Sequence, residues 1–165
     1  MEPMASVGPR VPIDLIPHLR RARDHIDRNY DRPLDIAELA AIAGVSRHHF
    51  VRTFGAVYGD TPMRHLTRRR IERAQDLLRS ANLTVTEVCM MVGFSSLGSF
   101  SSRFHELTGE TPTQYRDRFA RGGAPRIPGC FLFMRGPASL DHRPSSGADR
   151  RRTGTSGPRS PAGES

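Results

Sequence analysis

The sequence has no lysine and no tryptophan, and two of its 165 residues are cysteine. All 25 basic residues are therefore arginine, the side chain that binds phosphate and guanine through paired hydrogen bonds. Cys89 and Cys130 are isolated, which excludes a cysteine metal motif and indicates no disulfide framework. We interpret Cys89 as a core residue and expect no metal or other cofactor.

Long apolar runs are absent as well, so no stretch is predicted to cross a membrane. The first residues carry no apolar segment of the kind found in secretion signals. We find no phosphate-binding loop, no cluster of metal ligands and no nucleophile paired with a base, which argues against an enzyme. A cytoplasmic protein without catalytic activity is expected.

What the chain does contain is one pattern of eight residues, written twice. The copies lie 49 residues apart up to the central glycine and 50 apart after it. Each copy predicts a helix, a tight turn, a second helix and a glycine stop, which is a helix-turn-helix. The first copy consists of Leu34, Glu38, Gly44, Phe50, Phe54, Gly59, Thr61 and Pro62, and the second of Leu83, Glu87, Gly93, Phe100, Phe104, Gly109, Thr111 and Pro112.

The residues around these positions predict where each helix begins and ends. Asp35 with Glu38, and Thr84 with Glu87, fit a capping box, in which the cap side chain and the Glu satisfy each other's backbone amides. We predict that Ser46 caps a helix. Further predicted features are Ser96 as a cap, positive φ angles at Gly44 and Gly93, helix stops at Gly59 and Gly109, and helix starts at Pro62 and Pro112.

These signals predict an all-α fold: two helix-turn-helix subdomains joined by a long linker helix, with a disordered C-terminal tail. We expect a flexible arm over 1–13, a double helix-turn-helix domain over 14–119, and a tail over 120–165. Within the domain, the first lobe covers 14–60, the linker helix 61–80 and the second lobe 81–119. A linker helix of 18 residues is about 27 Å long, enough to hold two reading helices about one DNA turn apart.

The tail differs in composition from the domain. Gly, Pro, Ser and Arg dominate 136–165, which predicts disorder. One apolar island at 127–134 interrupts it. We interpret the island as a terminal strand that docks on the domain, with docking on a partner as the alternative.

The repeat and its flanking residues resemble the DNA-binding domain of the AraC/XylS family of bacterial transcriptional regulators. The resemblance covers about residues 15–119, and its most specific segments are 62–78 and 92–116. It implies two helix-turn-helix lobes joined by a rigid helix, and a regulator that activates or represses transcription. Because few residues precede the first expected helix, the chain resembles the short, stand-alone members or a fragment.

The resemblance also implies which side chains face DNA. Family members contact bases from the exposed face of each recognition helix, expected here at 47–58 and 97–108. The first helix would offer Arg47, His48, Val51 and Arg52, and the second Leu97, Gly98, Ser99, Ser102 and Arg103. The run of arginines on the linker helix is open to two interpretations, a solvated helix face or phosphate contacts. Within a DNA-binding layout we expect Arg68 and Arg69 to contact phosphates.

We therefore expect double-stranded DNA as the main partner, bound by a monomer, because the repeat already supplies two reading helices. RNA polymerase is a second candidate partner. The sequence departs from the family at Leu97, Gly98 and Ser102, where amides or long basic side chains are common. This departure leaves open an alternative, a truncated paralogue that acts through protein–protein contacts and binds DNA weakly.

Overall fold

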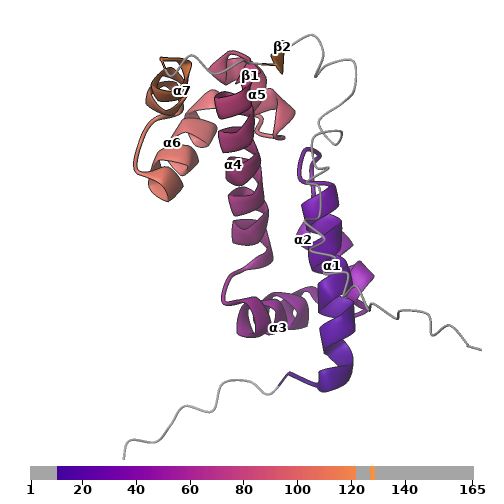
Figure 1. The fold of residues 1–165 in the computed structure, drawn as a ribbon. Coiled ribbons are helices and arrows are strands. Elements are labelled where there is room, and N and C mark those ends of the chain that lie inside the picture. Colours follow the sequence, from indigo (N-terminus) through magenta and orange to yellow (C-terminus); the bar gives the residue numbers. More distant parts are fainter. Residues whose placement is uncertain (1–10, 122–126, 129–165) are drawn as a thin grey trace, which may run out of the picture.

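The computed structural model describes residues 11–121 and 127–128 of the chain, and it is built almost entirely from helices (Figure 1). The all-α prediction is confirmed. Both recognition helices begin and end where the sequence predicts, at Arg47–Tyr58 and Leu97–Thr108. The described helices are a 3₁₀ turn at Ile13–Leu15, α1 (Ile16–Arg28), α2 (Ile36–Ala43), α3 (Arg47–Tyr58), α4 (Pro62–Ser80), α5 (Val85–Met91), α6 (Leu97–Thr108) and α7 (Pro112–Ala120).

The helices bury two separate apolar cores, one for each helix-turn-helix. In the first lobe, α1, α2 and α3 enclose the rings of Phe50 and Phe54 together with Leu66 from the start of α4. In the second lobe, Phe100 and Phe104 pack against the later part of α4, α5 and Tyr115 of α7. All four phenylalanines are fully buried, so their i, i+4 spacing marks the inward face of each recognition helix.

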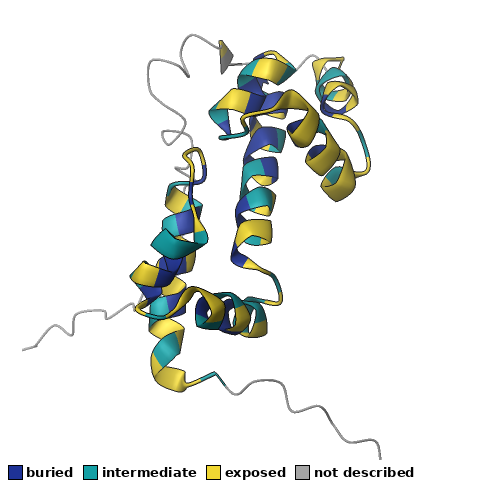
Figure 2. Ribbon diagram, turned by 180° about the vertical axis from the view of Figure 1, so that it is seen from behind, coloured by how far each residue is buried: buried dark blue, intermediate teal, exposed yellow. Residues whose placement is uncertain are grey.

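The long helix α4 serves both lobes, and buried residues recur along it (Figure 2). Its first turns close the first lobe, as α7 closes the second. Its last turns take the place in the second lobe that α1 holds in the first: the buried series Leu19, Ala22, Ile26 has the same spacing as Ile71, Ala74, Leu78. The repeat therefore extends through the linker helix, beyond the two copies of the motif.

The predicted caps form, with one exception. Ser46 and Ser96 each accept a hydrogen bond from the backbone amide three residues on. Thr61 and Thr111, directly before the predicted helix starts at Pro62 and Pro112, do the same. All four predicted turn and stop glycines have φ between 69° and 84°. The second lobe has the complete capping box of Thr84 and Glu87.

The exception is the first-lobe capping box, which is only half formed. Asp35 accepts from the amide of Glu38, but the Glu38 carboxylate turns to Arg32 and His25 instead of returning to the cap. The hydrogen bond from Arg32 holds the pKa of Glu38 below its usual value, despite some desolvation, with His25 adding to the effect. A stronger charged partner thus displaces the backbone amide.

The first residues of the apolar island join the domain. Ile127–Pro128 form a short parallel strand, β2, beside β1 (Ala81–Asn82), which follows α4. This pairing agrees with a docked strand at that point. The rest of the island, the segment 136–165 predicted to be disordered, and the arm over 1–10 lie outside the described residues.

Candidate nucleic-acid interface

The first recognition helix, α3, turns a basic face to solvent. Arg47, His48 and Arg52 are exposed, whereas Phe50 faces the core. Val51, also expected at the interface, is half-buried and packs against the core of the first lobe. The helix therefore offers three polar or charged side chains able to reach a groove, with Val51 at the edge of that face.

The second recognition helix, α6, turns a much less basic face to solvent. Its exposed residues include all five predicted site residues: Leu97, Gly98, Ser99, Ser102 and Arg103. Ser99 completes the start of the helix, because its amide donates to the Ser96 hydroxyl at 3.2 Å. Arg103 is the one long donor among these five, and its Nη1 lies 2.6 Å from the Glu106 carboxylate.

The arginines of α4 divide into different roles, which the sequence does not reveal. Arg64 and Arg68 are exposed, and both form ion pairs with Asp60. Arg69 is half-buried, with its guanidinium carbon 5.6 Å from the centre of the Tyr30 ring. Arg73 is buried. Of the two predicted phosphate contacts, Arg68 thus lies on the surface and Arg69 lies partly inside the first lobe.

Arg70 is the residue whose role sequence reasoning missed. Its side chain turns away from solvent and donates hydrogen bonds to two backbone carbonyls of the first lobe, those of Tyr30 and Arg32. In the sequence it is one of three consecutive arginines. Its sequence signal was its spacing of four residues from Leu66 and from Ala74, which are both buried on α4.

A shallow groove lies between the two lobes. It has a volume of about 410 Å³ and is lined by residues from the start of α4, the turn before it and the end of α6. Arg64, Arg68 and Arg103 contribute positive charge, and Asp60 and Glu106 contribute negative charge. The predicted site residues Arg68 and Arg103, distant in sequence, therefore line the same groove, between α4 and α6.

Three further features of the described residues concern metal binding, thiol chemistry and membrane crossing. Within 11–121 and 127–128, no three His, Cys, Asp or Glu side chains gather closely enough to hold a metal ion. Cys89 is buried in the second core, and burial raises the pKa of its thiol. None of the described helices combines the length and apolarity that crossing a membrane requires.

The comparisons with known proteins agree with this geometry. A helix-turn-helix domain model matches residues 39–118. The MmsAB operon regulatory protein of Pseudomonas aeruginosa is 36% identical over 89 residues, which cover 54% of this chain and 29% of that protein. A putative AraC-like transcription regulator of Streptomyces lividans is 36% identical over 91 residues, 55% of this chain and 30% of that protein. The chain thus spans less than a third of either relative.

Solved structures show the same fold. The DNA-binding domain of AdpA, a global transcriptional factor, solved in complex with a target DNA, has a TM-score of 0.61 and 28% identity over 64% of this chain and 96% of that chain. A probable AraC family transcriptional regulator from Rhodopseudomonas palustris has a TM-score of 0.59 and 30% identity, and the match covers 62% of this chain and 97% of that one. The chain described here belongs to the AraC family of transcriptional regulators.

Proposed function

We propose that this chain binds double-stranded DNA sequence-specifically, with α3 and α6 in successive major grooves. The observation that carries the proposal is the pair of capped recognition helices, each with its phenylalanines buried and its opposite face exposed. They lie towards opposite ends of one rigid helix of 19 residues, about 28 Å at 1.5 Å per residue (Figure 1). The structural relative solved with its target DNA supports the same use of the fold.

Arginines at the surface supply the attraction to phosphate. Arg47 and Arg52 from α3, Arg68 from α4 and Arg103 from α6 are all exposed. Arg68 and Arg103 are paired with acids in the free protein. DNA phosphates would compete with Asp60 and Glu106 for these guanidinium groups, so part of the binding energy is spent on exchanging partners.

The direct test is a selection of binding sites from random duplexes, followed by titration of the selected site at several salt concentrations. The logarithm of the affinity should fall with the logarithm of salt by about 0.9 for each phosphate neutralised. Arg68→Ala should reduce that slope by about one unit for all sequences alike. Arg79→Ala is the matched control, because Arg79 pairs with Asp76 near the end of α4 outside the groove. A flat salt response would overturn the proposal.

A monomer is the proposed binding unit, because one chain already supplies both reading helices. We expect a single asymmetric site of about 16–20 base pairs, covered by two lobes about one DNA turn apart. Sedimentation of the complex should give one protein per duplex. An obligate dimer on a palindromic site would contradict this expectation.

A second candidate function, contact with RNA polymerase or another regulator, is favoured by exposed apolar side chains on the second lobe. Met90 is 62% exposed, Leu107 46% and Leu97 44%. Met90→Ser should leave binding to the selected duplex unchanged while lowering transcription in a reconstituted assay, if the Met90 side chain contacts a protein. Equal binding to random and selected DNA by the unmodified protein would favour protein contacts as the main function.

A further inference from the structure

Arg70 joins the two lobes at the middle of the molecule. Its Nε donates to the carbonyl oxygen of Tyr30 at 2.7 Å, and its Nη2 donates to that of Arg32 at 3.0 Å. The guanidinium carbon of Arg70 also lies 5.5 Å from the centre of the Phe94 ring, and Phe94 lies in the turn between α5 and α6. One side chain of the linker helix thus contacts the loop after α1 and the turn between α5 and α6.

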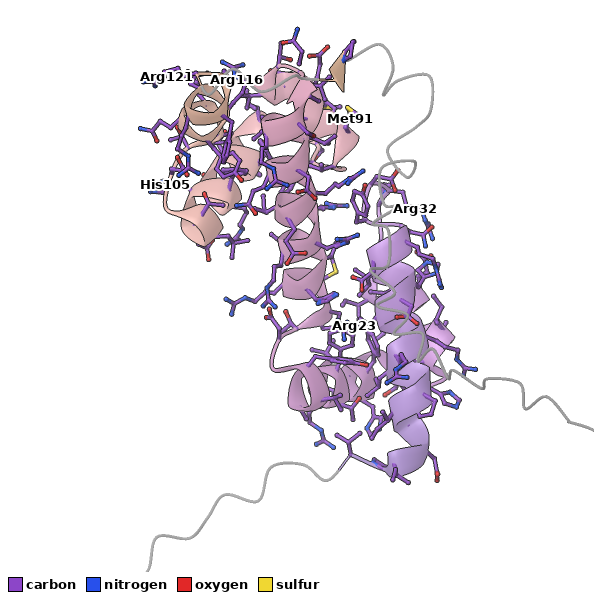
Figure 3. The ribbon with its side chains drawn as sticks, in the orientation of Figure 1. Arg23, Arg32, Met91, His105, Arg116 and Arg121 are labelled. Carbon is purple, nitrogen blue, oxygen red and sulfur yellow. The ribbon has the colours of Figure 1, made fainter. Side chains whose placement is uncertain are left out.

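The two lobes also touch directly beside Arg70. A Cβ placed on Gly93 would lie 2.6 Å from the carbonyl oxygen of Asp31, so the backbones of the two lobes are in close contact there. At Gly44, the equivalent turn glycine of the first lobe, the nearest atom would be His18 Nδ1 at 3.9 Å. The helix-turn-helix itself therefore does not require the close contact at Gly93. Figure 3 shows Arg32 at the end of the first lobe that faces Met91 and the second lobe.

The interactions of Arg70 are of a kind that can hold the two lobes in one orientation. Two backbone carbonyls receive charge-assisted hydrogen bonds, and the aromatic face of Phe94 lies near the cation. Burial lowers the pKa of Arg70, and Asp31 opposes that change, yet an arginine stays charged at any physiological pH. Removing the side chain would leave the carbonyl of buried Tyr30 without this donor.

We propose that Arg70 is a positioning residue that locks the angle between the two lobes and thereby sets the half-site spacing that this protein accepts on DNA. The spacing part rests on the proposed function. The core of the first lobe reaches α4 through Leu66 near the start of the helix, and Arg69 lies beside the Tyr30 ring. Arg70 adds a contact that reaches both lobes at once. One extra base pair between half-sites moves the second site by about 3.4 Å and turns it by about 34–36°. A rigid joint rejects such a change, and a loose joint tolerates it.

The first experiment needs no DNA. Spin labels placed at Ala56→Cys and His105→Cys report the distance between α3 and α6, with Cys130→Ser removing the second native thiol. Both labelled positions are exposed, whereas native Cys89 is buried and stays unlabelled. The protein with Arg70 should give one narrow distance distribution. Arg70→Ala should broaden it markedly, and an unchanged width in a folded variant would overturn the proposal.

The second experiment measures spacing on DNA. The selected duplex is compared with versions carrying one or two extra base pairs between the half-sites. The protein with Arg70 should lose about tenfold or more in affinity on the altered duplexes, which is about 1.4 kcal/mol. Arg70→Ala should lose less than about threefold while binding the native spacing more weakly. An equal spacing penalty in both proteins would overturn the role in site selection.

Two controls separate a joint from a general loss of stability. Arg70→Lys keeps the charge but cannot reach both carbonyls with a planar fork, so it should give an intermediate distribution width. Arg79→Ala removes an arginine of the same helix that pairs with Asp76, and it should change neither width nor spacing. If neither the unmodified protein nor any variant binds a duplex, the proposed function fails. The distance measurement then still decides whether Arg70 locks the angle between the lobes.

Discussion

The two lobes share one scaffold and differ in the residues placed on it. Both recognition helices have 12 residues, a serine cap and a left-handed glycine at the end. The equivalents Phe54 and Phe104 pack edge-on against another ring at the same position of the following helix, His65 in the first lobe and Tyr115 in the second. The two lobes thus share even single ring contacts in their cores, whereas the exposed faces of their recognition helices carry different residues. This contrast indicates that folding constrains one face of each helix and leaves the other free for recognition.

The sharpest difference lies at one pair of equivalent positions, Thr53 and Arg103. Thr53 is 2% exposed, and its hydroxyl donates to the backbone of its own helix. Arg103 has a side chain that is 58% exposed. Thr53→Arg would bury a cation without a prepared partner and should lower the free energy of unfolding by about 3–5 kcal/mol. Arg103→Thr should change it by less than about 0.5 kcal/mol.

Urea denaturation of both variants, followed by circular dichroism, measures this contrast. A similar cost for both substitutions would show that the two recognition helices are packed alike at this position. The result would also test whether the exposed side of α6 extends further around the helix than that of α3.

A second contrast separates turn geometry from contact between the lobes. Gly44→Ala places a Cβ at a φ of 69°, which should cost about 1–2 kcal/mol. Gly93→Ala carries the same strain at a φ of 84° and adds the clash with Asp31, which should cost about 1–3 kcal/mol more. The two melting temperatures give the difference directly. Equal losses would mean that the lobes move apart freely to admit the methyl group.

The third contrast concerns DNA reading. Arg52 and Ser102 are equivalent and both exposed, but only arginine can bind guanine through two hydrogen bonds. We expect Arg52→Ala to relax preference in one half-site by about 1–3 kcal/mol, and Ser102→Ala to change specificity little. Arg103→Ala should weaken binding to all sequences alike. Binding-site selection repeated on each variant checks the division, and loss of specificity in Ser102→Ala alone would reverse it.

Local signals in the sequence were enough to predict the helices and their ends. Caps, turn glycines and helix-starting prolines act within one turn of the chain, so Ser46, Gly44 and Pro62 could be placed without knowing the fold. The candidate site residues came from the resemblance to the AraC/XylS family, and the phenylalanines buried on the opposite face of each recognition helix agree with the exposure of most of them. The prediction of a complete capping box at Asp35 and Glu38 was wrong, because Glu38 bonds Arg32 and His25, and the His25 contact spans 13 positions along the chain.

Contacts between lobes could not be predicted in the same way. Arg68, Arg69 and Arg70 are three copies of one residue type, but they point in different directions around α4. Arg68 forms a surface ion pair, Arg69 lies near the Tyr30 ring, and Arg70 joins the two lobes. The close contact at Gly93 was equally hidden, because a turn glycine already explains its own φ. Long-range packing decides such roles, and a single sequence carries little trace of it.

The smallest expected contrast is in the response to acid, and it begins at the position where the first lobe has His65 and the second has Tyr115. His65 Nε2 lies 2.8 Å from Asp27 Oδ1, which ties α4 to α1 in the first lobe. Burial alone would raise the pKa of Asp27, but the hydrogen bond with His65 and the charges of His65, Arg23 and Arg69 hold it below its usual value of 3.8.

A carboxyl group whose pKa is lower in the folded protein stabilises it fully above the unfolded pKa. This contribution disappears as the pH falls through the folded value. The free energy of unfolding should therefore decline below about pH 4, and Asp27→Asn should flatten that decline while costing about 1 kcal/mol at pH 7. Glu106→Gln, which removes the acid of the exposed pair with Arg103, is the control for the loss of a surface carboxylate. Urea titrations at pH values from 2.5 to 7 measure the free energy of unfolding on both sides of the unperturbed carboxyl pKa of about 4. If the free energy falls equally steeply in acid for Asp27→Asn and the unmodified protein, Asp27 does not link the stability of the first lobe to pH.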